Sequence, residues 1–487
     1  MKSGPEMGQE STGIIRGERR RWLCIAYAFP PMLRSGTHRT LAFVRHLDRL
    51  GWDATVLTVE PGDEPSDPTL LDLVPTSTEI VRTPWIDSIA RIKCAFPFLK
   101  RREAGAGRAS CEPHHGRIHV SQNCKEGTPR SIGIRDWVSQ WLMTPDSRVG
   151  WIPAALRAAR RIVHLDRPDV IYSTSPYASA HLIAMGIARR ADIPWVADFR
   201  DPWGGNPFQA QRSAAAQTWD SYLERQVLRH ASQIICNTST QRSLLLNRFP
   251  RIANKCSVIL NGIDDEPINV EPIRIVPTGV FLLTHAGQFY GRRRPEPWLR
   301  ALAIAKHRHG STASRIHFAF LGGTTCDGCR LAEIAASHGV ADQVHVLGSK
   351  NHKDAFRILA GSDAVILAGA GGPGANLQVP NKLFEYLSLH RPILATVSPG
   401  NPAVDILRDA RADAMVCPPD DPDAIADALS KLVTRSSPSA NADWSGVDQF
   451  HRTHRAAELE SVFQRVNGGV EQLVAVAAPS TLAPALG

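Results

Sequence analysis

The sequence predicts an α/β protein built from two doubly wound, Rossmann-like domains that face each other across a cleft. Short apolar runs rich in β-branched residues alternate with longer helical patterns, which is typical of parallel sheets covered by helices. The alternation occurs twice, and a segment rich in proline and acidic residues, Asp265–Thr278, separates the two sets. A chain of 487 residues is long enough for two or three domains with sizeable cores.

The first set begins with a strand predicted over Trp22–Phe29 and a helix over Thr37–Leu50. In that helix three apolar side chains follow the i, i+4, i+7 spacing of a buried face, and Gly51 lies where a C-terminal cap is expected. Further strands of this set are expected at Ala54–Val59, Val170–Ser173, Trp195–Asp198 and Gln233–Thr238.

The second set of predicted strands, and the segments without strand or helix patterns, define the predicted domain boundaries. Its strands are expected at Val280–His285, Ile316–Leu321, Val344–Leu347, Ala364–Leu367 and Pro392–Val397. Residues 101–135 are basic and poor in large apolar side chains, so we expect an exposed insertion there. The predicted parts are a disordered start (1–21), a first domain (22–265), a linker (266–278), a second domain (279–445), a final helix (446–467) and a disordered tail (468–487).

The charge and the cysteine content limit the class of protein. Lysine and arginine number 56 against 47 acidic residues, and this excess favours anionic partners such as phosphates, nucleic acid or a membrane surface. No run of about 18 apolar residues occurs, and Met1–Arg21 lacks the apolar core of a signal peptide. Nine scattered cysteines fit a reducing compartment better than a disulfide framework. We therefore expect a cytoplasmic protein.

Residues 369–374 read GAGGPG, which matches the G-x-G-x-x-G spacing of dinucleotide-binding loops. Such a site requires a helix that opens on the last glycine and an acidic residue at the end of the next strand. Here six residues separate Gly374 from the helical stretch Asn381–Leu389, and the next strand is followed by Ser-Pro-Gly without an acid. We therefore interpret the loop as holding a different phosphate-bearing ligand.

Two other loops carry groups suited to an anion. Gly36 stands where a helix begins, so that backbone N–H groups can face a phosphate, although an ordinary βα turn would look the same. After the first strand of the second domain, Gly287 and Gly291 accompany three consecutive arginines, Arg292–Arg294. Guanidinium and backbone N–H groups together can hold a phosphate there, and a solvated surface run is the alternative.

The helix expected after the glycine-rich loop carries two charged residues near its start. Glu385 lies one turn into this helix, and its carboxylate can accept hydrogen bonds from two vicinal hydroxyls. Lys382, three residues earlier, lies on the same face. The alternative interpretation is a solvated Lys–Glu pair on an amphipathic helix.

Several segments together resemble the family 4-like nucleotide-sugar glycosyltransferases of GT-B architecture. The resemblance covers most of the chain from Trp22 to about Asn467, without residues 101–132. It extends over Ile25–Thr40, Pro168–Trp203, Val258–Asp264, His285–Pro297 and Val379–Ala395. Its most specific parts are ADFRDPW (197–203), NGID (261–264) and VPNKLFEYL (379–387) with RPIL (391–394). The segment PDSRVGW (145–151) is similar to that of a subgroup of polysaccharide-assembly enzymes.

This resemblance implies an enzyme that moves a sugar from a nucleoside-diphosphate sugar to a hydroxyl of a glycan or lipid-linked acceptor, with retention of the anomeric configuration. It implies no metal ion and no cofactor, since arginine and lysine supply the positive charge, and nucleic acid is not an expected partner. The first domain would serve the acceptor, the second would bind the nucleotide sugar, and the final helix, His451–Val466, would return to the first domain.

The resemblance also implies roles for individual residues. Glu385 would bind the ribose, Arg293 and Lys382 the diphosphate, and Gly36 would approach the same phosphates from the first domain. The segment Gly348–His352, with Gly348 and Ser349, would flank the base. As catalytic residues we predict Asp198, Arg200, Asp201, Arg293 and Lys382, and as substrate-binding residues Gly36, His38, Arg39, Gly287, Gly348, Ser349, Asn376, Gln378 and Glu385.

The chain departs from the family pattern at two places on the sugar side. Leu377 stands eight residues before Glu385, where the family often has a second glutamate, so this contact must come from the backbone of 375–378 or elsewhere. Residues 173–176 read STSP, where many members have a histidine. We therefore expect the polar groups on the sugar side to come from the DFRDPW segment, with His38 and Arg39 as further candidates. A non-catalytic nucleotide-sugar-binding protein and a nucleotide-sugar epimerase are the alternatives.

Two groups of potential metal ligands occur. Cys326 and Cys329 form a lone C-x-x-C without a second pair at zinc spacing, and we expect a glycine-containing βα loop there. The second group falls in the basic insertion, which offers no packed scaffold: Cys111, His114, His115 and Cys124. No metal site is expected.

The segment Ile89–Arg102 mixes apolar side chains with five positive ones. Basic residues are attracted to the anionic inner face of a membrane, and neighbouring apolar side chains can insert shallowly. We therefore expect peripheral attachment to that face. A loop that only covers the core is the alternative, because Pro97 interrupts any long amphipathic helix.

Overall fold

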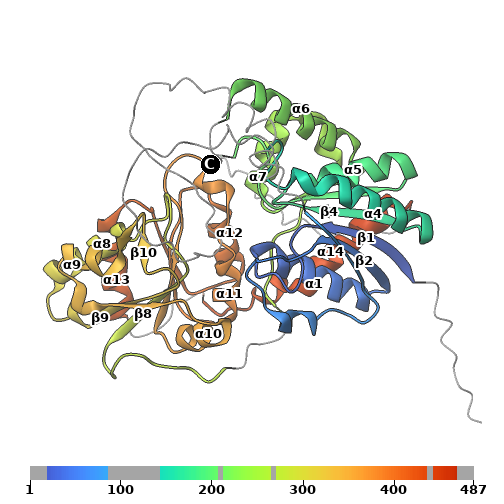
Figure 1. Ribbon diagram of the computed structural model, residues 1–487. Coiled ribbons are helices and arrows are strands. Elements are labelled where there is room, and N and C mark those ends of the chain that lie inside the picture. Colours follow the sequence, from blue (N-terminus) through green and yellow to red (C-terminus); the bar gives the residue numbers. More distant parts are fainter. Residues whose placement is uncertain (1–18, 86–142, 207–211, 265–269, 436–441, 469–487) are drawn as a thin grey trace, which may run out of the picture.

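The computed structural model describes residues 19–85, 143–206, 212–264, 270–435 and 442–468 (Figure 1). Within these ranges two α/β domains stand side by side, each built around a parallel sheet, so the predicted fold class is confirmed. The predicted insertion at 101–135, the segment Ile89–Arg102 and the second group of potential metal ligands lie outside the described residues.

The N-terminal sheet has seven parallel strands in the order β3-β2-β1-β4-β5-β6-β7. Its centre was predicted well, whereas both edge strands, β3 and β7, were not predicted. The strands are β1 (Arg20–Ala26), β2 (Trp52–Val59), β3 (Glu79–Thr83), β4 (Val170–Thr174), β5 (Trp195–Phe199), β6 (Gln233–Cys236) and β7 (Cys256–Val258).

Helices cover both faces of this sheet. One face packs against α4 (Ile152–Leu165), α5 (Ser179–Ala191) and α6 (Ala214–His230), around a core that includes Trp151 and Trp195. On the other face, α1 (Ser35–Arg49) packs against the final helix of the described chain, α14 (Arg452–Val466). Each large side chain buried in these cores contributes about 1.5–3 kcal/mol relative to exposure. A further helix, α7 (Ser239–Arg248), precedes β7.

The C-terminal sheet has six parallel strands in the order β12-β9-β8-β13-β14-β15. The strands are β8 (Phe281–Ala286), β9 (Ile316–Leu321), β12 (Val344–Gly348), β13 (Ala364–Ala368), β14 (Ile393–Thr396) and β15 (Ala414–Cys417). Two buried clusters lie on its opposite faces, one against α8 (Glu296–His309), α9 (Leu331–Ser337) and α13 (Pro422–Thr434), the other against α10 (His352–Ala360), α11 (Lys382–Ser388) and α12 (Pro402–Asp409).

Both sheets have a switch point, where the strand order reverses. It lies between β1 and β4 in the N-terminal domain and between β8 and β13 in the C-terminal domain. In open parallel sheets, ligands bind outside the carboxyl ends of the strands at this point. The loops after β1 and β8 are those that carry Gly36 and the three arginines, so the topology brings the predicted phosphate-binding segments to the switch points.

The PDSRVGW segment contacts the elements around the N-terminal switch point and stabilises them. Asp146 caps the start of α5, since its carboxylate accepts hydrogen bonds from the backbone N–H of Ser179 (2.7 Å) and from the Ser179 hydroxyl (2.8 Å). The Arg148 guanidinium lies over the rings of Tyr27 (4.9 Å) and Trp85 (4.2 Å). These contacts give the segment a structural role in holding α5 and β1 in place.

The chain crosses between the domains twice, and the two crossings are hydrogen-bonded to each other. The backbone N–H of Ile263 donates to the carbonyl of Phe450 (2.9 Å), and the N–H of Arg452 donates to the carbonyl of Ile263 (2.9 Å). Beyond this point α14 returns to the N-terminal domain and buries Phe463 beside Trp22 and Trp52. None of the described helices combines the length and the apolar character that crossing a bilayer requires.

Candidate active site

A cavity of about 660 Å³ opens between the two domains. It is bounded by α1, by the first interdomain crossing, by the faces of α10 and α11 and by the second crossing. The residues of the predicted site that line it are His38, Arg39, Lys382 and Glu385. Cavities of this size between domains are common sites for small ligands.

Glu385 brings a carboxylate without a protein partner to this cavity. It lies in the first turn of α11 and is half-buried, and no group in the described part of the chain donates a hydrogen bond to its side chain. Its neighbours on α11, Leu383, Phe384 and Tyr386, are buried in the domain core and fix the helix. Glu385 therefore offers two acceptor oxygens to a ligand with hydroxyl groups.

Lys382 lies between the large cavity and a second, smaller one of about 200 Å³. Its Nζ donates a hydrogen bond to the carbonyl oxygen of Ala286. Burial lowers the pKa of Lys382 to about 8, with the Arg293 guanidinium also lowering it and Glu385 opposing the shift. A side chain at Gly287, which has φ +144°, would collide with this ammonium group, so glycine is needed for the close approach.

The three consecutive arginines have different environments. Arg292 donates to the carbonyl of Pro373 in the GAGGPG loop (2.7 Å). Arg294 forms ion pairs with Glu296 (2.8 Å) and Asp327 (3.1 Å). Arg293 is half-buried and lines the smaller cavity together with Lys382. Its guanidinium donates to the Tyr290 hydroxyl (3.3 Å) and forms no ion pair with a carboxylate among the described residues. Of the three, Arg293 is the one whose charge faces a cavity.

The N-terminal domain contributes a helix start with a buried guanidinium beside it. Gly36 lies in the first turn of α1, and a Cβ placed on it would lie 2.6 Å from Nη1 of Arg200. A larger residue at this position would require the Arg200 guanidinium to move away. The positive end of α1 and the Arg200 guanidinium are thus close together after β1 and β5, where the predicted site required positive charge.

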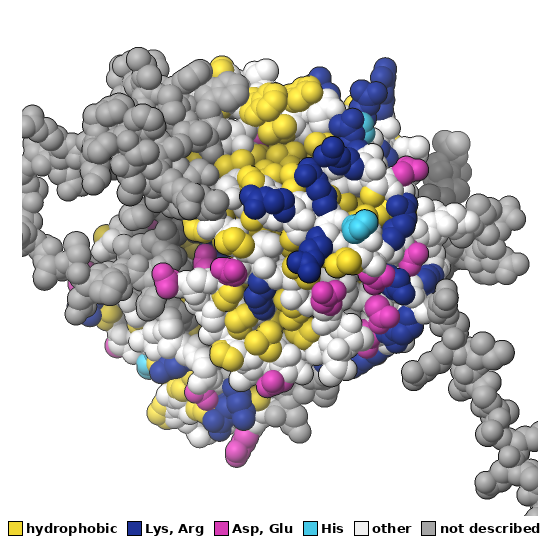
Figure 2. Space-filling view, turned by 45° about the vertical axis from the view of Figure 1, so that its right-hand side comes forward, with side chains coloured by type: hydrophobic (Ala, Val, Ile, Leu, Met, Phe, Trp, Pro, Cys, Tyr) yellow, Lys and Arg dark blue, Asp and Glu magenta, His cyan; other side chains and the backbone are white. Residues whose placement is uncertain are grey.

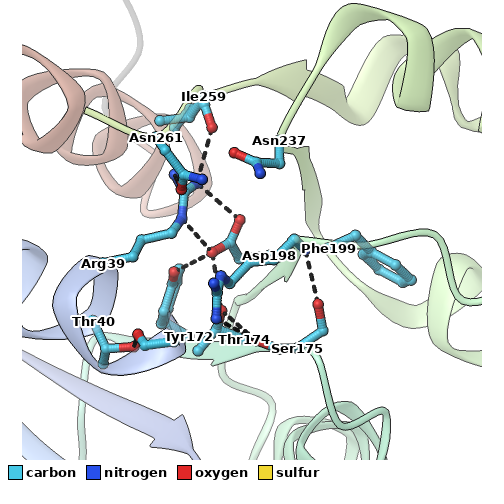
Figure 3. A network of polar contacts seen from close by, with 12 residues as sticks. Arg39, Thr40, Tyr172, Thr174, Ser175, Asp198, Phe199, Asn237, Ile259 and Asn261 are labelled. Atoms are coloured by element: carbon cyan, nitrogen blue, oxygen red, sulfur yellow. Dashed lines mark hydrogen bonds and ion pairs between the residues drawn. The ribbon is translucent and has the colours of Figure 1, made fainter. Parts of the chain in front are cut away.

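Asp198 and Arg39 form a buried ion pair beneath the site (Figure 3). Both carboxylate oxygens of Asp198 accept hydrogen bonds from Arg39, at 3.0 and 3.1 Å, and one also accepts from the hydroxyls of Tyr172 (2.6 Å) and Thr174 (3.0 Å). Burial raises the pKa of Asp198, but the Arg39 guanidinium outweighs it, so the pKa lies below its usual value. Arg39 also donates to the carbonyls of Ile259 and Leu260.

This geometry differs from the role predicted for Asp198. The side chain is fully buried and its acceptor capacity is used within the protein, so it does not present a carboxylate to a sugar. Instead it fixes Arg39 and, through Arg39, the segment at residues 259–261 that leads into the first crossing. Asp198 and Arg39 are therefore positioning residues for the cavity wall.

We expect Asp198→Asn to lower the free energy of unfolding by about 3–5 kcal/mol, because it leaves the buried Arg39 charge without its partner. Denaturant unfolding followed by tryptophan fluorescence measures this. The control is Asp166→Asn, which breaks an exposed pair with Arg21 and should cost less than about 1 kcal/mol. Equal, small losses in both variants would show that the buried pair does not stabilise the domain.

Three side-chain contacts join the loop at residues 375–381 to the N-terminal domain. The Gln378 amide donates to the Asp201 carboxylate (3.4 Å), and the Thr240 hydroxyl donates to the carbonyl of Asn376 (2.8 Å). Asn261 and Asn381 share a further hydrogen bond. Asp201 thus lies at the contact between the domains, where burial raises its pKa and the Arg200 guanidinium opposes the rise. The described conformation is one in which the domains touch across the site.

Three of the remaining predicted residues, Gly287, Gly348 and Ser349, lie at the rim of the C-terminal sheet. Gly287 follows β8 and Gly348 is the last residue of β12. Gly322, which was not predicted, follows β9, and its backbone N–H donates to the carbonyl of Gly348 (2.9 Å). Ser349 donates to the carbonyl of Gly322 (3.4 Å). His38 lines the large cavity from α1, and burial, with the Arg452 charge, lowers its pKa. Gly348 and Ser349 line neither cavity.

Two residues near the site were not predicted. Asn401 caps α12 and its amide also donates to the carbonyls of Ala375 (3.0 Å) and Gln378 (3.1 Å), which fixes the loop that touches the N-terminal domain. The sequence signal that could have identified Asn401 as a helix cap is the Asn-Pro pair at the start of α12. His285, at the end of β8, is buried and lines the smaller cavity.

The GAGGPG loop follows β13 and does not open a helix. Gly374 has φ +72° and precedes a short 3₁₀ turn, Ala375–Leu377, before α11 begins at Lys382. The loop is fixed by the Arg292 guanidinium and by a hydrogen bond from the N–H of Gly369 to the carbonyl of Thr396 (2.7 Å). The geometry of a dinucleotide-binding turn is therefore not present at this place.

Two family models match the two domains in turn. The model of Glycosyltransferase Family 4 matches residues 120–267, and that of Glycosyl transferases group 1 matches residues 281–435. The chain belongs to the family 4-like GT-B glycosyltransferases. This membership agrees with the two facing domains and with the expectation drawn from the sequence.

The curated relatives carry the name D-inositol 3-phosphate glycosyltransferase. The protein of Stackebrandtia nassauensis is 24% identical over 249 residues, which are 48% of this glycosyltransferase chain and 54% of that protein. That of Nocardiopsis dassonvillei is 30% identical over 133 residues, 25% of this chain and 31% of that protein. The chain thus spans about half, or less, of the length of the relatives it matches.

Solved structures share the GT-B fold at low sequence identity. Sucrose-phosphate synthase from Thermosynechococcus elongatus has a TM-score of 0.54 at 14% identity, over 93% of this chain and 100% of that one. HepE of Anabaena in complex with UDP has a TM-score of 0.52 at 11% identity, over 92% of this chain and 100% of that one. A Listeria monocytogenes protein described as a candidate UDP-N-acetylglucosamine 2-epimerase has a TM-score of 0.52 at 8% identity, over 93% of this chain and 98% of that one.

Proposed function

We propose that the protein transfers a sugar from a nucleoside-diphosphate sugar to a hydroxyl group of a glycan or of a lipid-linked acceptor. The observation that carries this proposal is the convergence of three charged groups on one interdomain site. The Glu385 carboxylate faces the large cavity and accepts no hydrogen bond from any described residue, and the Lys382 and Arg293 cations lie beside it. A nucleotide sugar has the matching groups, with ribose hydroxyls next to a diphosphate.

The charges fit the needs of the reaction. As the bond between the sugar and the diphosphate breaks, negative charge gathers on the leaving group and the sugar becomes oxocarbenium-like. Arg293, Lys382 and the start of α1 at Gly36 would stabilise that charge from both domains. The contacts of Gln378 and Asn376 with the N-terminal domain would keep water from the site, where it would otherwise hydrolyse the donor.

We propose retention of the anomeric configuration. Inversion requires a base that activates the acceptor on the face opposite the leaving group. Asp198 cannot serve as this base, because its carboxylate is buried on Arg39. With retention, the acceptor oxygen forms the new bond on the face from which the diphosphate leaves, and a diphosphate oxygen takes the acceptor's proton.

Incubation of the purified protein with UDP-, ADP-, GDP- and dTDP-sugars, followed by detection of free nucleotide and of sugar products, tests the proposal. The panel of acceptors includes a polyol phosphate, since the curated relatives are named for D-inositol 3-phosphate, and a lipid-linked glycan. Acceptor-dependent release of nucleotide supports transfer. An epimerised sugar nucleotide, or binding without turnover across the panel, would assign the site to an epimerase or to a non-catalytic binding protein.

We also propose that the enzyme works at the cytoplasmic face of a membrane, where a lipid-linked acceptor would be met. Exposed basic side chains gather on the layer formed by α4, α5 and α6, and in the described residues none of them is paired with a carboxylate: Arg157, Arg160, Arg161, Arg189, Arg190, Arg225 and Arg229. Figure 2 shows dark blue side chains crossing the upper part of the face that the N-terminal domain forms, with most acidic side chains below them.

The charges of this basic layer lie close together. Burial lowers the pKa of His230 at the end of α6, and the nearby Arg189, Arg229 and Lys255 charges lower it further. Like charges without partners repel each other in the isolated protein, and an anionic surface relieves this repulsion. The segment Ile89–Arg102, for which the sequence predicts membrane attachment, lies outside the described residues, and its role stays a prediction.

We expect the protein to float with vesicles that contain anionic phospholipid at low ionic strength and to be released by salt. Arg157→Gln, Arg160→Gln and Arg161→Gln together should weaken the partition about a hundredfold, at about 1 kcal/mol for each charge. The control replaces three exposed cations of the C-terminal domain, Arg300, Arg330 and Lys353, by glutamine. If the wild-type protein stays unbound at low salt, or both triple variants lose binding equally, the basic layer is not the membrane contact.

A further inference from the structure

The smaller cavity, of about 200 Å³, lies at the C-terminal switch point, beside the ends of β8 and β13 and the start of α11. Its volume is roughly six times the volume that one water molecule occupies in the liquid. Leu367, Ala368 and Pro380 provide apolar walls, and His285, Arg293 and Lys382 provide polar groups. Because Lys382 lines both cavities, the smaller one adjoins the site proposed for the nucleotide.

His285 brings a hydrogen-bond acceptor to this cavity. Its Nδ1 lies 3.0 Å from the carbonyl oxygen of Ile366, which can only accept, so Nδ1 carries the hydrogen. Burial lowers the pKa of His285 to about 3, with the Lys382 and Arg293 charges adding to the shift and the bond to Ile366 opposing it. The ring is therefore neutral at pH 7, and Nε2 has a free lone pair.

This lone pair has no donor within the described residues. The side chain is 3% exposed and the ring stacks on Phe289, at 4.6 Å between centroids, so it cannot turn towards bulk water. A buried acceptor without a donor is unfavourable by about 1–3 kcal/mol. Such a group at the wall of a cavity is explained when a ligand supplies the missing hydrogen.

The chemistry of the cavity selects the kind of ligand. At neutral pH a diphosphate oxygen only accepts hydrogen bonds, so it suits the Arg293 and Lys382 cations and would be repelled at Nε2 of His285. A hydroxyl group can donate to Nε2, and the C–H faces of a sugar ring suit Leu367, Ala368 and Pro380. Of the parts of a nucleotide sugar, the transferred sugar combines these two properties next to the diphosphate.

We propose that the smaller cavity receives the transferred sugar and that Nε2 of His285 accepts a hydrogen bond from one of its hydroxyl groups. This inference rests on the proposed function, because it assigns a place to one part of the nucleotide-sugar donor. It makes His285 a residue that distinguishes the nucleotide sugar from the nucleoside diphosphate. Arg293 and Lys382 would then bind the phosphates that both ligands share.

Calorimetric titration of UDP-glucose and UDP, or of the corresponding pair for the donor that the panel selects, tests this assignment. In His285→Asn, the shorter amide can keep the bond to Ile366 but has no atom at the position of Nε2. We expect its affinity for the nucleoside diphosphate to stay within about twofold and its affinity for the nucleotide sugar to fall about tenfold, the loss of one hydrogen bond. In His285→Gln, the longer amide places an oxygen near Nε2 and should restore most of the affinity.

The matched control is His181→Asn. His181 is also buried with an Nε2 that lacks a partner in the described residues, but it lies in the N-terminal core and lines neither cavity. It should leave the ratio of the two affinities unchanged. If the His285 variants fail to fold, Ala368→Val narrows the same cavity and should weaken the nucleotide sugar selectively.

The possible outcomes separate this inference from the proposed function. A selective loss in His285→Asn with recovery in His285→Gln supports the sugar site. Equal effects on both ligands, or none, in the His285 and Ala368 variants overturn it, while the proposed transferase function stands. If the wild-type protein binds no nucleotide sugar of the panel, the proposed function itself fails.

Discussion

Arg293→Ala is expected to lower kcat by about 10²–10³, because one preorganised donor to the developing charge of a leaving group is worth roughly that factor. The structure gives a reason to separate Arg293 from its neighbours. Arg294 is already paired with two carboxylates and Arg292 with a backbone carbonyl, whereas the Arg293 guanidinium faces the cavity that Lys382 also lines. Steady-state release of nucleotide at saturating donor measures the effect.

Arg292→Ala and Arg294→Ala are the controls, since each removes the same charge from the same loop. We expect each of them to retain activity within about tenfold of the wild type, because neither charge lies at the reacting groups. Circular dichroism would exclude unfolding of the loop-bearing domain. Three equal and small losses would mean that the arginine run is a solvated surface feature.

Glu385→Ala is expected to lower kcat/KM by more than about a hundredfold. The carboxylate has no partner in the described residues, so the proposed ribose would supply two charge-assisted hydrogen bonds, each worth about 1.5–3 kcal/mol. Most of the loss should appear at low donor concentration, and direct titration with the nucleoside diphosphate should show the same weakening. Glu385→Gln should fall between alanine and wild type, since it keeps an acceptor but loses the charge.

Glu333→Ala controls for the general loss of a negative charge from the C-terminal domain. Glu333 is exposed on α9, and no described residue forms an ion pair with it. It should behave as wild type in both kcat and KM. If Glu385→Ala does the same at low donor concentration, Glu385 does not contact the donor.

The central strands were predictable because each combines an apolar run with two buried faces. Ile316–Leu321 was predicted with the bounds that β9 has, and β4 and β13 each extend one residue beyond the prediction. The edge strands β3 and β15 were missed because they are short and partly exposed. EIVRT has only two adjacent apolar residues, and AMVC, although apolar, is only four residues long.

The site was predictable where local sequence decides the geometry. Lys382 and Glu385 lie on one short helix whose start is fixed by its own buried residues, so their spacing placed both at the same site. The burial of Asp198 depends instead on Arg39, a partner 159 residues away, which no local pattern reveals. The role of His285 depends on a cavity formed by three separate elements, and a histidine at the end of a strand gives no sign of this.

The return of α14 to the N-terminal domain has a consequence for biosynthesis. Until residues 452–466 have been made, the first domain to emerge from the ribosome has one face of its sheet covered by α1 alone, which leaves part of the surface around Trp22, Trp52 and Tyr172 uncovered. Only then does Phe463 pack against all three aromatic rings. The N-terminal domain therefore matures last although it is translated first, and a nascent chain interrupted within the C-terminal domain presents an uncovered aromatic surface to chaperones and proteases.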